Sequence, residues 1–338
     1  MKRKNVLPLL VFFIIAFSAC RLSPKIPQQV SIRGVVFGTY YSISYFDKKA
    51  TLYQEEIDSL FAVFNESMSY YVPQSLISRV NNNEAREVDE FFRVVYQHSL
   101  EVYQATEGAF DPTVSPLVNA WGFGFRKRED ISQTMIDSLR QLTGLDHTRL
   151  EGNLIIKDDP RIQFDFNAIA KGYAADVVGK FLESKGISTY LVEIGGDLVV
   201  RGKKPDGSLW RIGLEKPATE AEDPQDYDYY VELLDQAVAT SGNYRRYYEE
   251  GGQRFSHTID PFTGYPVTHN LLSVSVFSPH GITSDAYATA FMVMGFEKAK
   301  AFVESHPEMD AFFIYSAGPE HFGTYATPGL KLLKRDKL

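Results

Sequence analysis

Residues 165–201, DFNAIAKGYAADVVGKFLESKGISTYLVEIGGDLVVR, decide the fold class, because a helix in this stretch is followed directly by two strands. Residues 170–185 repeat apolar side chains at helical spacing, and Gly186 is suited to end that helix. Runs rich in β-branched residues at 189–194 and 198–202 predict two strands. The strands follow each other with no helix between them, which favours an α+β fold over a regular βαβ series.

The same mixture of elements continues on both sides of this stretch. Further helices are predicted at 51–66, at 88–106, from Asp111-Pro112, from Ser284-Asp285 to about Met294, and from Phe296 to Ser305. Further strands are predicted within 32–46 around Gly34 and Gly38, and at 210–215, 231–240, 271–278 and 311–316. The acidic, irregular residues 218–230 are interpreted as a surface insertion. No convincing linker interrupts 31–338, so we expect one domain, with two lobes as the alternative.

Composition and charge set limits on function. The chain has 338 residues, 44% of them hydrophobic, which is enough apolar material for a full core. Its formal net charge of -8 argues against nonspecific nucleic-acid binding, which requires a basic surface. We therefore expect no nucleic-acid partner.

The N-terminus has the pattern of a lipoprotein signal peptide. Basic residues 2–4 precede an apolar run over 6–17, and two small residues then stand before Cys20. We expect residues 1–19 to be removed and Cys20 to carry lipid, such as palmitate. A plain signal peptide with an incidental cysteine is the alternative. A membrane-spanning anchor is less favoured, because the apolar run is shorter than the ~20 residues that a span needs.

Cys20 is the only cysteine in the chain, so the mature domain has no internal disulfide. Residues 20–30 are expected to form the lipidated cysteine and a short polar tether. Acyl chains on Cys20 would hold the domain on a bacterial membrane without a spanning helix, facing the periplasm. The inner membrane is the expected location, although the sequence does not separate it from the outer one.

Asp285 and Thr289 form the first candidate site. They stand four residues apart in SDAYATA (284–290), so on a helix their side chains share one face. A carboxylate and a hydroxyl are hard oxygen ligands of the kind that Mg²⁺ prefers. The alternative is that Asp285 caps the helix and Thr289 bonds its own backbone.

Four other segments carry groups suited to a nucleotide. In 165–173, a strand-to-helix turn and Lys171 would bind phosphate, although a solvated lysine in an ordinary turn is the simpler interpretation. The paired glycines in Glu193–Asp197 indicate a hairpin turn or the close approach of a ligand. His257 would act as a base or as a cation beside phosphate, against the commoner packed or solvated histidine. Aromatic rings among glycines in 107–124 suit a flavin or adenine, with core packing the more frequent role.

Several familiar catalytic patterns are missing from the sequence. It contains no zinc-ligand spacing, nucleophile elbow, dinucleotide fingerprint or kinase loop. The residues alone therefore predict an α+β enzyme that binds phosphate and a metal ion.

Taken in order, these segments resemble the ApbE family, the FAD:protein FMN transferases. The similar segments are GAFDPTVSPLVNAWGFG (108–124), DFNAIAKGY (165–173), LVEIGGD (191–197), ATSGNY (239–244), SHTIDPFTGYPV (256–267) and SDAYATA (284–290). Their common order over most of residues 34–326 makes coincidence improbable. The resemblance implies a single α+β domain of the ApbE, T-fold-like type over 31–338.

The resemblance also implies roles for individual residues. Asp285 and Thr289 would bind Mg²⁺ with the backbone carbonyls of Ala168 and Ala288. The FAD site would be lined by Phe37, Tyr71, Ala109, Phe110, Asp111, Asp165, Lys171 and Ile259. His257 would lie near the diphosphate, and His257, Lys171 and Asp285 would be the catalytic residues. The family often has Met-Gly-Thr where this chain has Phe37-Gly38-Thr39.

The activity implied by the resemblance is the Mg²⁺-dependent splitting of FAD. FMN would be joined through a phosphoester to a threonine or serine of an acceptor flavoprotein, in a membrane electron-transfer complex, and AMP would be released. One alternative is an FAD diphosphatase that gives FMN and AMP, and another is a flavin-binding lipoprotein without catalysis. Tyr71 favours the transferase, because this position influences the choice within the family.

Overall fold

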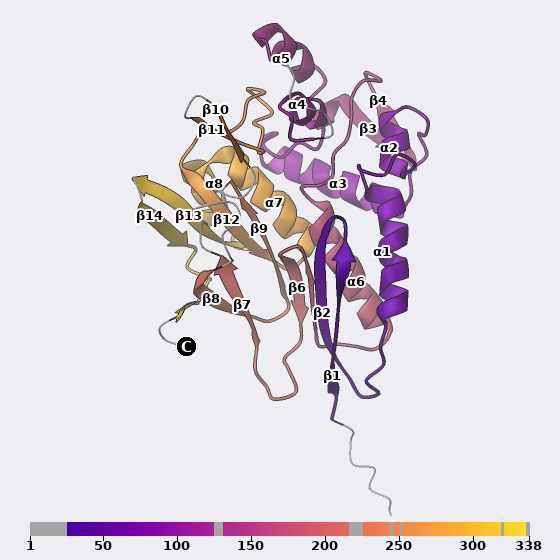
Figure 1. Cartoon of the computed structure of the whole chain (residues 1–338), viewed down its shortest axis with the longest axis vertical. Coiled ribbons are helices and arrows are strands. Elements are labelled where there is room, and N and C mark those ends of the chain that lie inside the picture. The colour runs from indigo at the N-terminus through magenta and orange to yellow at the C-terminus, as the bar shows by residue number, and fades with distance from the viewer. Residues whose placement is uncertain are drawn as a thin grey trace, which may run out of the picture.

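The structure, a computed structural model, describes residues 26–124, 131–215, 226–243, 247–250, 253–318 and 321–335. Its centre is an eight-stranded antiparallel sheet (Figure 1). The strand order is β1 (Gln28–Val36), β2 (Thr39–Asp47), β5 (Tyr190–Ile194), β6 (Asp197–Arg201), β9 (Gln236–Gly242), β12 (Leu271–Ser278), β13 (Asp310–Gly318) and β14 (His321–Ala326). The predicted α+β class is confirmed.

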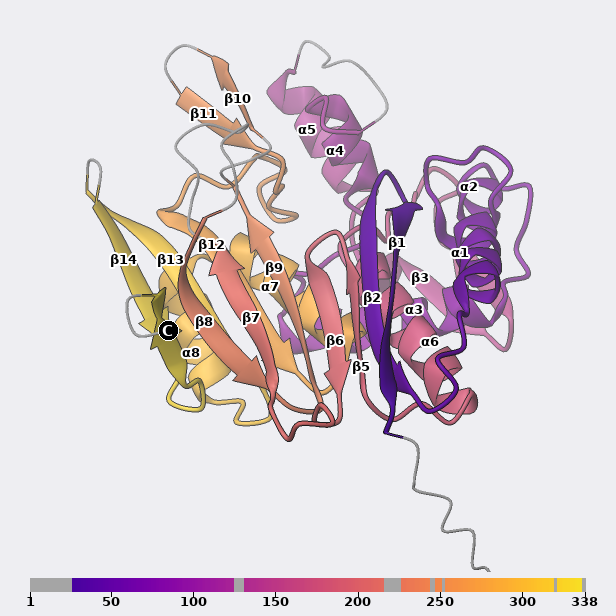
Figure 2. The ribbon, with the colours of Figure 1, turned by 60° about the horizontal axis from the view of Figure 1, so that its bottom comes forward.

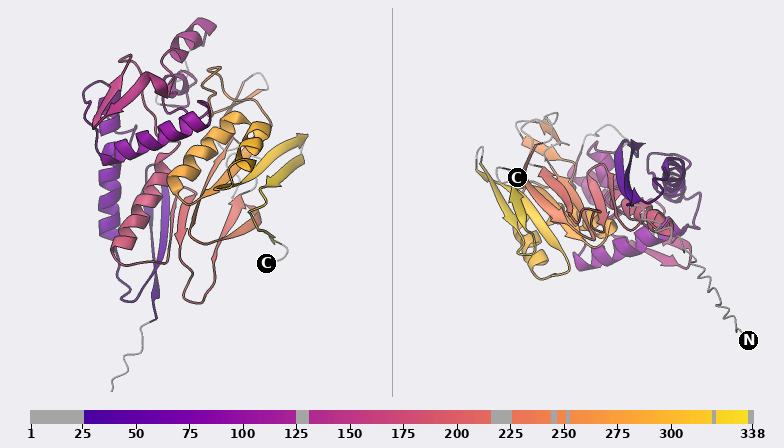
Figure 3. Two further views of the ribbon diagram at one scale, coloured as in Figure 1. Left: turned by 180° about the vertical axis from the view of Figure 1, so that it is seen from behind. Right: turned by 90° about the horizontal axis from the view of Figure 1, so that it is seen from below.

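Helices cover one face of this sheet, as the view from behind shows (Figure 3). The helices are α1 (Gln54–Met68), α2 (Leu76–Asn81), α3 (Glu90–Ala105), α4 (Ser115–Ala120), α5 (Gln133–Arg140), α6 (Ala170–Ser184), α7 (Gly281–Met294) and α8 (Phe296–Glu304). A 3₁₀ turn, η1 (Leu145–His147), precedes a small hairpin of β3 (Thr148–Glu151) and β4 (Leu154–Lys157). Among the described helices, none is long and apolar enough to cross a membrane.

A small sheet covers part of the opposite face (Figure 2). Its strands, in order, are β15 (Leu332–Lys334), β8 (Tyr227–Leu233) and β7 (Trp210–Glu215). A separate hairpin is formed by β10 (Tyr247–Glu250) and β11 (Gln253–Ser256). A secondary core fills the space between the two sheets, where Trp210 and Leu214 pack in one cluster with Phe277. The large sheet is thus covered by helices behind and, over part of its front face, by the small sheet.

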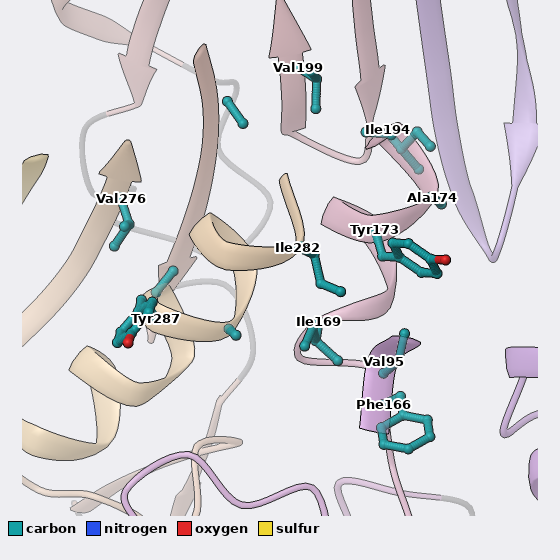
Figure 4. Close-up of a cluster of buried hydrophobic side chains, with 14 of the residues drawn as sticks. Val95, Phe166, Ile169, Tyr173, Ala174, Ile194, Val199, Val276, Ile282 and Tyr287 are labelled. Atoms are coloured by element: carbon teal, nitrogen blue, oxygen red, sulfur yellow. The ribbon is translucent and has the colours of Figure 1, made fainter. Parts of the chain in front are cut away.

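The main core lies between the large sheet and the helices, and α6 and α7 form its centre (Figure 4). The α7 sequence is apolar nearly all round, which is typical of a helix buried on every side. Phe291 and Met292 on this helix are fully buried. Ile169 and Tyr173 at the start of α6 face Ile282 of α7 within the same cluster.

The N-terminal turns of α6 and α7 touch backbone to backbone. A Cβ on Gly172 would lie 2.1 Å from the carbonyl oxygen of Gly281, and one on Gly281 would lie 2.3 Å from that of Gly172. The α6 carboxylate of Asp176 caps α7 by accepting hydrogen bonds from Gly281 N and Ile282 N, both at 2.9 Å. This close crossing fixes the first turns of both helices relative to each other.

We expect Gly172→Ala to lower the free energy of unfolding by about 1–3 kcal/mol, because the added methyl group has no room against a backbone oxygen. Chemical denaturation would measure the change. Lys180→Ala, at an exposed position of the same helix, is the control and should stay within about 0.5 kcal/mol of the wild type. Equal stability of the Gly172 variant and the wild type would contradict this packing.

Several predicted boundaries were wrong. The helix expected from Asp111-Pro112 begins only at Ser115, because the Asp111 carboxylate accepts hydrogen bonds from Thr113 and holds a turn instead. The helix expected from Ser284-Asp285 begins at Gly281, capped by a carboxylate from another helix. The run 231–240 is two strands, joined by a turn with Asp235 at φ 53°.

Two other predicted segments overlap strands. Strand β1 begins at Gln28, so the end of the predicted tether is part of the sheet. Strand β8 begins at Tyr227, inside the predicted insertion. The rest of that insertion, residues 218–225, lies outside the described residues, as do the signal peptide and Cys20.

Candidate active site

A cleft of about 940 Å³ gathers residues that are far apart in the sequence. Predicted site residues that line it are Tyr71, Ala109, Phe110, Asp111, Asp165, Ala168, Lys171, His257, Ile259, Asp285 and Thr289. This volume is within the range of small-molecule sites and suits a ligand as large as a dinucleotide. The fold therefore brings most of the predicted residues to one place.

Two predicted residues lie outside the cleft lining. Phe37 occupies the turn between β1 and β2 with φ 51°, and its ring packs against Phe61 and Phe64 at centroid distances of 5.7 and 5.4 Å. Ala288 is fully buried in α7. Phe37 thus contributes to the core beside the cleft and not to its wall.

The chemical centre of the cleft is an ammonium group held by two carboxylates. Lys171, in the first turn of α6, forms an ion pair with Asp197 of β6 and lies 3.8 Å from Asp285 Oδ1 of α7. Asp285 Oδ2 accepts a hydrogen bond from Gly172 N at 3.0 Å. Both carboxylates are buried, whereas the lysine side chain remains one-third exposed (33%) to the cleft.

These contacts determine which of the groups are charged. Burial alone would lower the pKa of Lys171, but the charges of Asp197 and Asp285 outweigh it and raise that pKa. Lys171 is therefore a cation at neutral pH. Burial, together with the charge of Asp285, raises the pKa of Asp197 to about 7 despite its ion pair with Lys171. Asp197 is thus only partly ionised at neutral pH, and a second cation bound at this centre would favour its ionised form.

The oxygen groups beside Lys171 fit a magnesium ion. Asp285 and Thr289 lie on one face of α7, and Ala168 lines the same cleft. The Thr289 hydroxyl is 3.4 Å from the hydroxyl of Ser241 on β9, so a second hydroxyl is close by. No group of three or more His, Cys, Asp or Glu residues suited to a metal occurs in the described ranges. The donors are thus carboxylate, hydroxyl and carbonyl oxygens, a set that Mg²⁺ accepts when phosphate and water complete it.

Asp197 is the main residue that the sequence analysis missed as a functional group. Its sequence signal was the glycine turn Gly195–Gly196 before it, which was interpreted as a hairpin or a ligand contact. The hairpin is confirmed, because the two glycines adopt φ values of 57° and 95° in the turn between β5 and β6, and both glycines also line the cleft. Thr240 N donates to Asp197 Oδ1 at 3.4 Å and helps to orient this carboxylate.

Aromatic and amide groups form another wall. Tyr71 is 55% exposed at the cleft, and its hydroxyl accepts a hydrogen bond from Asn167 Nδ2 at 3.5 Å. Asp165 Oδ1 accepts from Asn167 N at 2.8 Å, and Asp165 N donates to Pro112 O at 2.7 Å. His257 also lines the cleft, and its ring centroid is 6.5 Å from that of Phe123. An exposed ring above a fixed turn suits the face of a flat heterocycle.

Asp111 should make stability depend on pH. Burial raises its pKa from 3.8 to about 6, against the opposing hydrogen bonds from Thr113. The folded state thus binds this proton more tightly than the unfolded state does. The stabilisation is complete below about pH 4 and is lost as pH rises through about 6. Asp111→Asn lacks this titrating group. As pH rises from 4 to 7, its free energy of unfolding should therefore increase by about 2–3 kcal/mol relative to that of the wild type. Urea denaturation at several pH values measures this, and parallel stability curves would contradict it.

The fold is α+β, and its large cleft combines one lysine with carboxylate and hydroxyl oxygens. The sequence matches the ApbE family over residues 37–313. This chain belongs to the ApbE family. The predicted enzyme class, a transferase, is confirmed as well.

Several relatives cover nearly the whole chain. An FAD:protein FMN transferase of Vibrio cholerae is 40% identical over 291 residues, which is 83% of this chain and 86% of the relative. One from Escherichia coli K12 is 35% identical and covers 89% of this chain and 88% of the relative. Among solved structures, flavin transferase ApbE from Vibrio cholerae superposes with a TM-score of 0.79 at 37% identity, over 89% of this chain and 98% of that one. The apo flavinyl transferase ApbE of Pseudomonas stutzeri gives 0.79 at 34% identity, with 89% and 95% coverage.

Proposed function

We propose that this protein transfers the FMN half of FAD to a threonine or serine hydroxyl of an acceptor protein in a Mg²⁺-dependent reaction that releases AMP. The observation that carries the proposal is the group formed by Lys171, Asp197 and Asp285 at the wall of a dinucleotide-sized cleft. The names of the relatives, FAD:protein FMN transferase, support the same reaction.

The diphosphate of FAD would bind beside Lys171. This lysine lies in the first turn of α6, where backbone N–H groups and the helix dipole favour an anion. Asp197 holds the ammonium group in place and keeps it protonated. Tyr71 and the 109–111 segment would contact the rings of the substrate. Lys171 therefore binds and orients the phosphates and is a poor base.

Mg²⁺ would be held by Asp285, Thr289 and the carbonyl of Ala168. When bound, it supplies charge neutralisation and Lewis-acid activation at the diphosphate. The Gly172 N–H fixes one oxygen of Asp285, which leaves the other oxygen directed toward Lys171 and the cleft. The first turns of α6 and α7 thus position the metal-binding carboxylate before substrate arrives.

The reaction exchanges one phosphorus–oxygen bond for another. The acceptor hydroxyl attacks the phosphorus on the FMN side of the diphosphate. As the new O–P bond forms, the bond from this phosphorus to the bridging oxygen breaks, and AMP leaves with its electron pair. The hydroxyl proton passes to a base, for which His257 is favoured over Lys171 because Lys171 stays protonated.

We propose further that the domain is anchored to a bacterial membrane by lipid on Cys20 and faces the periplasm. The basic, apolar and small residues before Cys20 support this location. The acceptor would then be a flavoprotein of a membrane electron-transfer complex, within reach of the anchored domain.

The proposal is tested by incubating residues 21–338 with FAD and Mg²⁺, with and without candidate acceptor proteins, and measuring AMP. AMP release that depends on the acceptor supports the transferase. Equal AMP release without an acceptor, accompanied by free FMN, would instead identify an FAD diphosphatase. Bound FAD with no AMP under either condition would identify a flavin-binding lipoprotein and overturn the proposal.

A further inference from the structure

One part of the cleft extends away from Lys171 across the front of the large sheet. Its floor is formed by side chains of β2 and β5, namely Tyr40, Ser42, Ser44, Leu191 and Glu193, and its wall by Arg211, Ile212, Gly213 and Glu215 of β7. We call this part the sheet-face groove. The alternate residues Tyr41 and Ile43 of β2 point into the main core, so Ser42 and Ser44 face the groove. The proposed FAD and metal contacts involve no residue of the groove floor.

The wall of the groove is a strand edge. In the three-stranded sheet, β7 pairs with β8 on one side, and no strand of the described residues pairs with its other side. Figure 2 shows β7 in front of the large sheet, with β6, β5 and β2 following beside it. An edge strand offers a row of N–H and C=O groups to any extended chain that lies alongside.

A fourth strand added to this small sheet would lie in the groove. Neighbouring strands are about 4.8 Å apart, and packed sheets are about 10 Å apart. The next strand after β7 would therefore run above β5 and β2, over the floor formed by Ser42 and Ser44. These short side chains leave room for a backbone to approach the floor, whereas the cluster of Trp210 and Leu214 fills the space beneath β7 itself.

The sheet-face groove is continuous with the part of the cleft that contains Lys171. Leu191 and Glu193 precede the Gly195–Gly196 turn along β5, and Asp197, the partner of Lys171, follows that turn. Four residues of strand span about 13 Å, the length of a short extended peptide. A chain in the groove would thus place one end beside the position of the diphosphate.

We propose that the sheet-face groove binds an extended segment of the acceptor protein, which pairs with the edge of β7 that faces away from β8, as a fourth strand of the small sheet. The proposal rests on the proposed function, because the hydroxyl to be modified lies at the end of this segment next to Lys171. Main-chain hydrogen bonds to β7 provide affinity, and the side chains over Ser42 and Ser44 provide selectivity. The groove suits an extended chain rather than a helix, because only an extended backbone can pair with the edge of a strand.

Ser42→Trp tests the groove, because a large ring on its floor blocks a chain above it. The acceptor used is one shown by mass spectrometry to gain FMN from the wild type. We expect Ser42→Trp to lower kcat/KM for this acceptor at least about tenfold, while FAD affinity and AMP release without acceptor stay within about twofold. Ser59→Trp, exposed on α1 and outside the cleft, is the matched control and should behave as the wild type.

A second test avoids any effect of substitution on folding. Residues 21–338 contain no cysteine, so Ser44→Cys introduces a single thiol that a bulky maleimide can block after folding. We expect blocking to abolish transfer to the acceptor but not FAD binding, with Ser59→Cys as the control.

Unchanged transfer in both blocked Ser44→Cys and Ser42→Trp overturns the docking site and leaves the transferase intact. Loss of FAD binding in either of these two variants would show that the groove binds FAD, and it would also overturn the docking site. Absence of FMN on every acceptor tested with the wild type overturns the proposed function and the docking site together.

Discussion

Asp285→Asn should reduce AMP release from FAD by about two to three orders of magnitude at low Mg²⁺. The asparagine still accepts the hydrogen bond from Gly172 N, so the packing of α6 against α7 is kept. The substitution removes the negative charge that would hold the metal. Stabilisation of the transition state by a metal ion is worth several kcal/mol, and each 1.36 kcal/mol corresponds to a factor of about ten in rate. Rates measured across a Mg²⁺ titration should show the midpoint shifted to higher concentration.

Asp176→Asn is the matched control for this effect. Asp176 is another buried carboxylate in the same helix crossing, but it caps α7 and does not line the cleft. Its replacement should lower unfolding stability by about 1 kcal/mol and leave the Mg²⁺ midpoint unchanged. A wild-type Mg²⁺ midpoint in Asp285→Asn, or the same shift in both variants, would rule out Asp285 as the metal-binding carboxylate.

Lys171→Met should lower both stability and activity, because it leaves Asp197 and Asp285 facing each other without a cation. Breaking a buried ion pair from one side costs about 3–5 kcal/mol. We expect a value near the lower end, since Lys171 is one-third exposed (33%). Denaturation with and without Mg²⁺ would measure it, and the ion should stabilise this variant more than the wild type because it supplies the missing positive charge.

The double variant Lys171→Met/Asp197→Asn separates the two roles of the lysine. Removing both members of the ion pair should restore part of the lost stability, since Asp285 is then the one carboxylate of this centre left without its cation. Activity should stay low, because nothing replaces the ammonium group beside the diphosphate. Recovery of activity along with stability would show that Lys171 has only a structural role.

The parts of the fold set by local pattern were predictable. Helices α1, α3 and α6 and strands β5, β6 and β7 fall at the expected residues within a few positions, because each depends on its own periodicity and end signals. The four-residue spacing of Asp285 and Thr289 also predicted their shared helix face. Local sequence thus provided the elements and several of the site residues.

What could not be predicted depends on contacts between distant segments. Asp197 meets Lys171 only because the hairpin of β5 and β6 lies against the start of α6, and no spacing in the sequence encodes this approach. The start of α7 is set by Asp176, more than a hundred residues earlier in the chain. Phe37 shows the reverse case, since its family position suggested a ligand contact but its ring packs on α1.

The intact mass of an acceptor protein after incubation with the enzyme, FAD and Mg²⁺ is the decisive measurement of FMN transfer. We expect a gain of one FMN, mapped by fragmentation to a threonine or serine, with an equal amount of AMP and complete loss of both in EDTA. An FMN-modified acceptor that forms equally well in EDTA, or AMP formed with an unmodified acceptor and free FMN, would contradict it.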